Sequence, residues 1–185
     1  MHMKDVLARD HSEIDDLLRR ARHALDQSDH AAAFRFLDLL WARLAVHIRV
    51  ENTLLFPTLE RARRERLAAD PRLQQQGPPS LPLLAKLRQD HDFFMRELTR
   101  AVLTLKRLCR EPYSRDAHAV RSELQRCLAA VEDRLRDHNR LEESEVYGQP
   151  DQWLGVRELE QLERNIVQDL HRLPARWACD REPPH

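Results

Sequence analysis

Apolar residues recur at alternating spacings of three and four along five stretches of this chain, a pattern typical of helices with one buried face. The first stretch runs from about Lys4 to Leu25 and precedes a short polar break at 27–29. The last lies within residues 150–177, with apolar positions at Val156, Leu159, Leu162, Ile166, Leu170 and Leu173. The pattern predicts an all-α protein.

A proline interrupts the second of these stretches. Its inward positions begin at Ala33 and end with Leu54 and Thr58, and Pro57 lies between the last two. Because proline removes a backbone donor and crowds the preceding turn, we expect a kink near Leu54 or a restarted helix that reaches about Ala68.

Breaker residues mark the ends of the third and fourth helices. The segment 70–82 is rich in proline and predicts a loop, from which Ser80 can cap a third helix with Pro82 in its first turn. A fourth helix runs from about 116 to 146, where the following Gly148 and a proline terminate it.

The connections predict the topology. Those at 26–30 and 110–115 are short and favour antiparallel neighbours, so residues 4–147 are expected to form an up-down-up-down four-helix bundle. The additional C-terminal helix within 150–177 is expected to pack on this bundle, or on a partner protein or a second copy in a homodimer.

The composition agrees with a helical protein and excludes several classes of partner. Hydrophobic residues make up 42%, charged residues 34%, and there are only three glycines. The 31 basic and 31 acidic residues cancel, so nothing suggests nucleic acid as a partner. Apolar runs stay short of the roughly 20 residues that a membrane span needs, and no signal peptide is evident, so we expect a cytoplasmic protein without membrane contact. Three cysteines without metal-type spacing predict ordinary thiols.

Six polar residues occupy inward positions that otherwise hold apolar side chains. A buried carboxylate is strongly disfavoured unless a positive charge compensates it, and no lysine or arginine shares these rows. A metal ion would provide that charge. The candidate metal ligands are His11, His47, Glu51, His91, His138 and Glu142.

Spacing supports this interpretation. His47 with Glu51, and His138 with Glu142, stand four residues apart and therefore on one helix face. Counted from the connections, His11 and His47 lie at similar depth, roughly 24 to 27 Å from their common end. His91 and His138 differ by four residues, or about one turn, so their match is looser. The remaining histidines are expected at the surface: His2, His23, His30, His118, His171 and His185.

Imidazole and carboxylate ligands without thiolate suit iron, and six ligands from four helices suffice for two ions. If Glu51 and Glu142 bridge, each ion receives two nitrogens and two oxygens. Ferritin-like di-iron proteins use Glu-x-x-His, whereas both pairs here are His-x-x-x-Glu, which disfavours that class. A metal-free helical scaffold that binds a partner through its last helix remains the alternative.

The motifs around these residues resemble the hemerythrin-like, or HHE cation-binding, family. They are Asp-His-Ser-Glu-Ile at 10–14, His-Ile-Arg-Val-Glu at 47–51 before Leu-Phe-Pro, Asp-His-Asp at 90–92, and His-Asn-Arg-Leu-Glu-Glu at 138–143 before Val-Tyr. The resemblance covers about residues 4–147. It implies two non-haem iron ions, oxo- or hydroxo-bridged, that bind dioxygen or related small molecules.

One departure separates the chain from oxygen-carrying hemerythrins. These look similar but have a second histidine one turn from the first on the third helix, whereas here Leu87 and Met95 flank His91. This shifts the resemblance from simple oxygen carriage toward bacterial hemerythrin-like proteins associated with sensing, iron handling and stress. Candidates for the missing ligand are Glu143, Glu145, Asp15 and Tyr147, although contact with a ligand or exposure to solvent is the more ordinary expectation for each.

Two functions therefore stay open. The first is a di-iron binding protein that binds or senses O2, NO or redox state, or that handles iron. The second is a di-iron enzyme or stress-repair factor that reduces peroxide or NO or repairs iron–sulfur clusters. Their ligand sets would look alike, so the sequence does not decide whether the protein is an enzyme.

Overall fold

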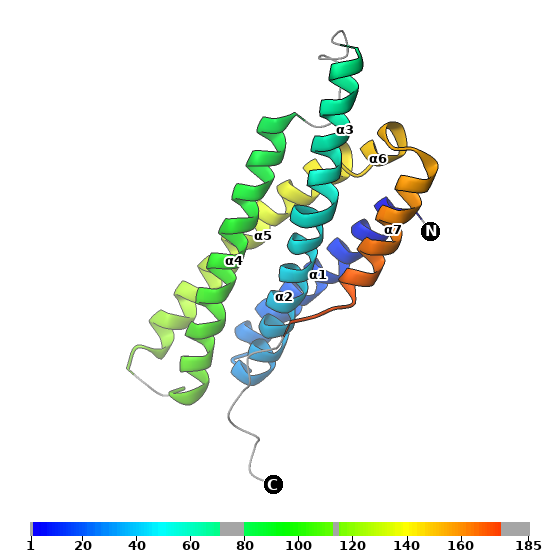
Figure 1. Cartoon of the computed structure of the whole chain (residues 1–185). Helices are drawn as coiled ribbons and strands as arrows, with labels where there is room; N and C mark the ends of the chain where they lie inside the picture. Colours follow the sequence, from blue (N-terminus) through cyan, green and yellow to red (C-terminus); the bar gives the residue numbers. More distant parts are fainter. Residues whose placement is uncertain (1, 71–79, 113–114, 175–185) are drawn as a thin grey trace.

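Four long helices form the body of the protein. The computed structural model describes residues 2–70, 80–112 and 115–174, and all regular structure in these ranges is helical. The four helices, shown in Figure 1, are α1 (Met3–Asp26), α2 (His30–Val50), α4 (Leu81–Arg110) and α5 (Ala117–Glu145). Helix α1 packs against α2 and α5, and α4 packs against the same two helices. Sequential helices are thus neighbours, which confirms the predicted four-helix bundle.

Side-chain caps set two of the helix starts. The carboxylate of Asp29 accepts from the amide of Ala32 at 2.9 Å, and the Ser80 hydroxyl accepts from the amide of Leu83 at 3.3 Å. Pro82 lies in the first turn of α4, where its missing donor costs nothing. Most of the predicted 70–82 loop lies outside the described residues.

A π-helical turn, η1 (Glu51–Leu55), joins α2 to α3 (Phe56–Ala69), which extends the α2 column past the end of the bundle (Figure 1). The amide of Phe56 donates to the carbonyl of Glu51, five residues back, and Pro57 follows without a donor of its own. A π-turn holds one residue more than an α-helical turn. All positions after it therefore rotate by one residue relative to the rows of α2.

Because of this rotation, the inward positions predicted beyond Glu51 are wrong. Leu54 and Thr58, predicted to face inward, are only half-buried, whereas Leu55 and Leu59 are at most 1% exposed. The predicted interruption near Pro57 is present, but its form is a widened turn inside a continuous helical column.

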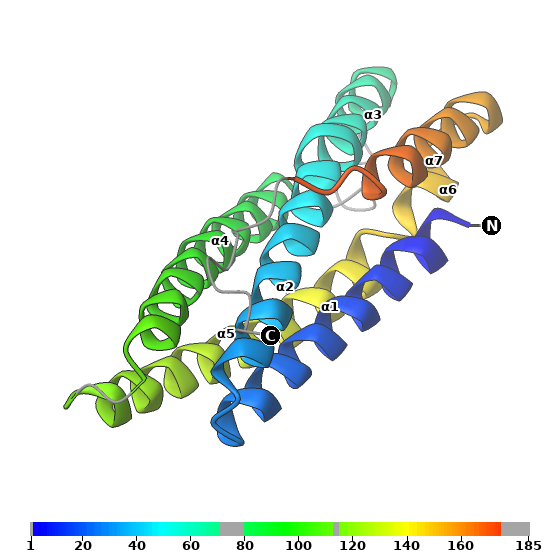
Figure 2. The same cartoon turned by 90° about the horizontal axis from the view of Figure 1, so that it is seen from below.

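Two further helices follow the bundle, α6 (Gln149–Trp153) and α7 (Val156–Leu170). Helix α7 runs outside the four helices beside the N-terminal part of α1 (Figure 2), and it contacts α2 and η1 as well. Its Leu162 and Ile166 are buried against the bundle. Leu173 was predicted in this helix but lies beyond its end and is 42% exposed, because the helix stops at Leu170.

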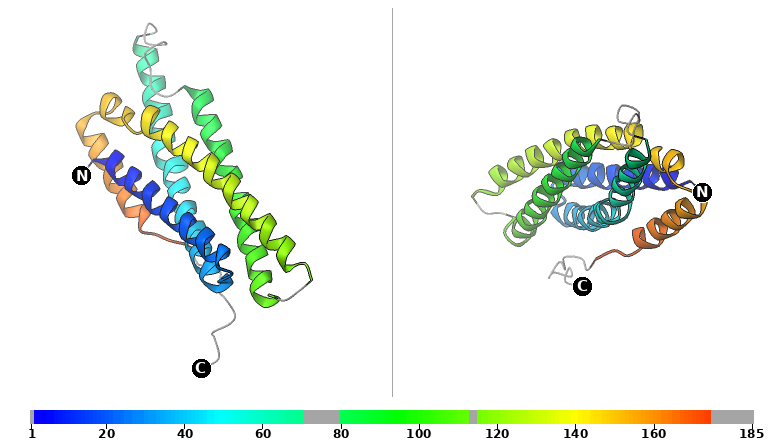
Figure 3. Two further views of the ribbon diagram at one scale, coloured as in Figure 1. Left: turned by 180° about the vertical axis from the view of Figure 1, so that it is seen from behind. Right: turned by 45° about the horizontal axis from the view of Figure 1, so that its top comes forward.

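The core is divided into two apolar clusters with a polar layer between them. One cluster lies toward the α1–α2 and α4–α5 connections and contains Leu18, Leu98 and Leu128. The other lies toward α7 and contains Leu7 and Leu87. Figure 3 shows the four bundle helices in two further views, from behind and with the top turned forward, with α7 outside them. Among the described residues, no helix is long and apolar enough to cross a membrane.

Candidate metal centre

The polar layer consists of the six residues singled out from the sequence, each at most 3% exposed. Their side chains form two overlapping groups in which one ligand atom per residue lies within 4.8 Å of the others. One group is His11, His47, Glu51 and Glu142; the other is Glu51, His91, His138 and Glu142. The structure therefore brings all six together.

Each glutamate faces both histidine pairs. Glu51 Oε1 lies 3.4 Å from His47 Nε2, while its other oxygen, Oε2, lies 3.2 Å from His91 Nε2. Glu142 Oε2 lies 3.3 Å from His11 Nε2, while its Oε1 lies 3.1 Å from His138 Nε2. The two carboxylates thus lie between two pairs of imidazoles, as bridging ligands would.

Outer partners fix the histidines of the first group. Nδ1 of His47 donates to Asp10 Oδ2 at 2.8 Å, and Nδ1 of His11 donates to Glu143 Oε1 at 2.8 Å. A carboxylate can only accept, so the proton of each neutral imidazole sits on Nδ1 and the Nε2 lone pair points inward. The two Nε2 atoms are 3.1 Å apart.

The second group is arranged in the same way. Nδ1 of His138 faces Asp90 Oδ2 at 3.4 Å, and Nδ1 of His91 donates to Asn52 Oδ1 at 3.2 Å. Here too the Nε2 atoms of the two histidines face each other, at 3.2 Å.

A cation fits this donor set. The lone pairs of four imidazoles and two carboxylates converge in a buried space. At these separations the negative ends of their dipoles repel one another. Glu51 Oε2 and Glu142 Oε1 are buried without a hydrogen-bond partner among the described residues. Orphaned carboxylate oxygens of this kind are strongly disfavoured unless a positive charge lies beside them.

Without a metal ion, protons compensate the two carboxylates. Burial alone would lower the pKa of His91, but the carboxylates of Glu142 and Glu51 raise it to about 9. Burial and Glu142 would raise the pKa of Glu51, but His47 and His91 hold it at about 2. Burial would likewise lower the pKa of His47, which Glu51 and Asp10 raise well above its usual value. The site therefore attracts positive charge in both cases: protons when no metal ion is bound, and otherwise the metal ion itself.

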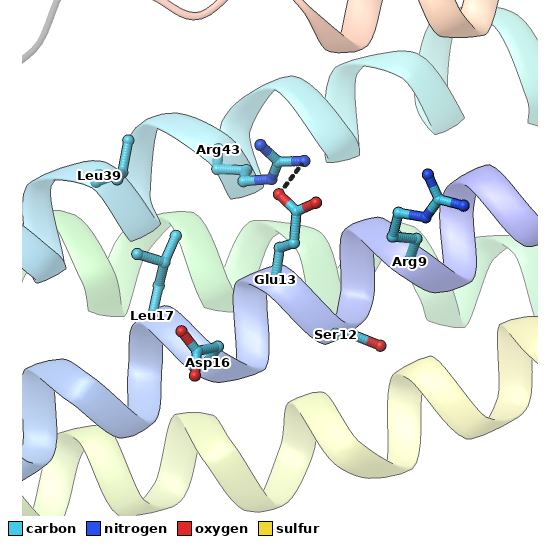
Figure 4. A pocket seen from close by; sticks show the side chains of 7 residues that line it. All are labelled: Arg9, Ser12, Glu13, Asp16, Leu17, Leu39 and Arg43. Atoms are coloured by element: carbon cyan, nitrogen blue, oxygen red, sulfur yellow. Dashed lines mark ion pairs between the residues drawn. The ribbon is translucent and has the colours of Figure 1, made fainter.

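Arginines hold the outer carboxylates in place. Arg43 pairs with Asp10 and also with Glu13, the latter at 2.7 Å (Figure 4). In the other half, the Arg134 Nε donates to Asp90 Oδ1 at 2.7 Å, and Lys86 Nζ donates to Asp90 Oδ2 at 3.0 Å. Burial would raise the pKa of Asp90, but Lys86 and Arg134 lower it. Both aspartates thus stay ionised and able to accept from a histidine.

The site is built twice from one sequence pattern. Asp-His occurs at 10–11 and again at 90–91, and Arg-Leu-x-x-His-x-Arg-x-Glu occurs at 43–51 and again at 134–142. In each half the aspartate of the first helix contacts the histidine of the second. The residue after each glutamate, Asn52 or Glu143, contacts the histidine on the first helix of the other half. This repeat is the signal that could have revealed these outer partners from the sequence.

The four candidates for an additional ligand separate clearly in the structure. Glu145 and Asp15 are exposed. Glu143 contacts His11 at the nitrogen that points away from the centre. Tyr147, only 1% exposed, places its hydroxyl inside the first group, 2.6 Å from Glu51 Oε1.

Two other expectations need correction or adjustment. His30 was predicted at the surface but is half-buried, with its Nε2 covered, because it starts α2 beside the α4–α5 end of the bundle and contacts Cys109 through its carbonyl. The expected offset of one turn between His91 and His138 is absent. The count used helix ends that each differ by one residue from those observed at Arg110 and Ala117, which accounts for two of the four residues.

Comparison with known proteins gives one result. The hemerythrin HHE cation-binding domain family matches residues 2–149, which include the whole bundle and all six inward residues. Neither the curated proteins nor the solved structures gave a match. With most of its length matched, and with the buried histidines and glutamates that a cation site requires, the chain belongs to the hemerythrin HHE cation-binding domain family.

Proposed function

We propose that this protein holds two non-haem iron ions in the polar layer and uses them to bind or sense a small molecule such as O2 or NO. His11 and His47 would hold one ion, His91 and His138 the other, and Glu51 and Glu142 both. The observation that carries the proposal is the placement of each glutamate, whose two oxygens face opposite histidine pairs.

The donor set favours iron over other ions. Imidazole with carboxylate and no thiolate suits iron, whereas a closed zinc site needs only four ligands. Iron in such surroundings supplies redox chemistry and positions for small diatomic ligands. The outer partners Asp10, Glu143, Asp90 and Asn52 lie at the Nδ1 atoms and so turn the Nε2 lone pair of each neutral imidazole inward, which typically strengthens metal binding.

Two aromatic rings beside His91 and His138 favour a small, weakly polar ligand. The Phe56 ring stacks on His91 with centroids 5.8 Å apart, and the Phe94 ring meets His138 edge-on at 5.2 Å. A hydrated or strongly charged molecule would lose its water there without new partners. O2 and NO lose little, which supports them as ligands.

A surface cleft leads toward the centre from one side. It has a volume of about 540 Å³ and is lined by His11, Asn139 and Glu143 among others. Glu143 is 47% exposed at this cleft and contacts the outward nitrogen of His11. We assign this cleft as the entry for both ions and small ligands.

Anaerobic iron loading of the purified chain tests the proposal. We expect two irons per chain, followed by reversible spectral changes on addition of O2 or NO. Turnover of peroxide or NO would instead identify the same centre as that of an enzyme. A chain that retains no iron after reconstitution with ferrous ions would contradict the proposal.

A further inference from the structure

The two halves of the repeated site differ at one inward-facing aromatic position. Phe56 and Tyr147 both stand five residues after a central glutamate, and in both cases their amide donates to that glutamate's carbonyl. The two rings also lie alike: Phe56 on His91 at 5.8 Å between centroids, and Tyr147 beside His11 at 5.4 Å. Only Tyr147 carries an oxygen.

That oxygen lies within reach of every candidate ligand of the first group. It is 2.9 Å from His11 Nε2 and 3.4 Å from His47 Nε2. It is also 2.6 Å from Glu51 Oε1 and 3.1 Å from Glu142 Oε2.

With neutral imidazoles, as metal binding requires, hydrogen bonding alone does not account for this position. A phenol has one proton to donate, whereas all four neighbours then present lone pairs, because Asp10 and Glu143 hold the imidazole protons on the outer nitrogens. At most one of the four contacts is satisfied by the hydroxyl proton, and the others bring lone pairs together. Five converging donor atoms of this kind suit a single metal ion.

We propose that Tyr147 is a protein ligand of one metal ion, so that the two ions are held by different donor sets. This inference rests on the proposed function. The ion at His11 and His47 has five protein donors, whereas the ion at His91 and His138 has four. On coordination the phenol O–H bond is replaced by an oxygen–metal bond, and the proton leaves to solvent.

The difference directs incoming ligands. The position with fewer protein donors, beside Phe56 and Phe94, is the one left for an added small molecule. Tyr147 completes the other position, at His11 and His47, and therefore does not stand in for the second histidine that this chain lacks beside His91.

The ferric-loaded full chain provides the test, because a phenolate bound to ferric iron gives visible charge-transfer absorption and resonance-enhanced tyrosine ring vibrations. We expect both signals in the wild-type protein. Tyr147→Phe keeps the ring but removes the oxygen, and should abolish both signals while both irons stay bound. Tyr113, the only other tyrosine in the sequence, supplies the control, and Tyr113→Phe should leave the signals unchanged.

Each outcome is decisive. Iron-loaded wild-type protein without tyrosine vibrations overturns the inference and leaves the proposed function standing, as does an unchanged spectrum in Tyr147→Phe. A wild-type chain that takes up no iron overturns the proposed function itself. Gallium(III) titration provides a readout without redox chemistry. Its ultraviolet tyrosine difference signal should appear in the wild-type protein and disappear in Tyr147→Phe, whereas an equal signal in both contradicts the assignment.

Discussion

Asp10 precedes His11 in the sequence, but its carboxylate contacts His47 of the neighbouring helix, at 2.8 Å from Nδ1. One dipeptide thus supplies a candidate ligand and orients another. Burial would raise the pKa of Asp10, but His47 and Arg43 lower it, so this carboxylate stays charged beside the imidazole. Asp90 repeats the arrangement toward His138 at the longer distance of 3.4 Å.

The first prediction concerns these two aspartates. Asp10→Asn should weaken metal binding by about 10–100-fold, the usual effect of losing an outer carboxylate from a metal-bound histidine. Asp90→Asn should have a smaller effect, because its contact is longer. Competition with a chelator measures both. Glu13→Gln is the control, since Glu13 also pairs with Arg43 but touches none of the six inward residues; an equal loss in this variant would assign the effect to general charge.

The second prediction concerns the two central glutamates. Glu51→Ala or Glu142→Ala should lower the metal content toward one or zero ions per chain, because each faces both histidine pairs. His11→Ala or His91→Ala should leave a partly occupied site. Elemental analysis after equal loading distinguishes the two patterns. The exposed Glu145 provides a control whose replacement by Ala should preserve full content.

Glu143→Ala separates an outer role from a direct one. Glu143 contacts the outward nitrogen of His11, so its loss should weaken binding of one ion without removing the other. An empty site in Glu143→Ala together with a filled one in Glu142→Ala would mean that the inward face of α5 is assigned wrongly.

The third prediction concerns pH. In the metal-free protein the pKa of His91 is raised to about 9, from about 6.5 in an unfolded chain. Its stabilising contribution is therefore complete below pH 6.5 and lost as pH rises through 9. The pKa of Glu51 is lowered to about 2, so its contribution is present above pH 4.5 and lost as pH falls through 2.

These signs place the greatest stability of the metal-free protein between about pH 4.5 and 6.5. The metal-loaded protein should behave differently above this range, because metal ions compete with protons for the imidazoles and bind better as pH rises. Thermal melts with and without chelator, over pH 4 to 9, measure both curves. Parallel curves above pH 6.5 would contradict histidine ligation.

The sequence predicted the bundle and the inward residues because both follow from helical periodicity. Leu18, Leu98 and Leu128 repeat at the spacings that bury one helix face, and His91 or Glu142 stand out as polar residues in the same rows. Periodicity is a property of single helices. Contacts between helices, such as that of Asn52 with His91, depend on the geometry with which the helices cross, which periodicity does not predict.

The π-turn escaped prediction for a different reason. Pro57 indicated a disturbance, but proline is compatible with a kink, a break or a widened turn, and packing selects among them. Here the widened turn buries Phe56 against His91 and turns Leu55 inward. Inward positions counted at constant α-helical spacing beyond the π-turn are therefore one residue out of register.

The last prediction tests that register. Leu55 is fully buried, so Leu55→Ala should lower the free energy of unfolding by about 2–5 kcal/mol, the cost of a cavity in a packed core. Leu54→Ala, one position earlier, should cost clearly less because Leu54 is half-buried. Urea unfolding of the metal-free proteins measures the difference without a contribution from bound metal. If Leu54→Ala were the more damaging change, α2 would continue through Pro57 with α-helical spacing, and Phe56 would no longer lie over His91.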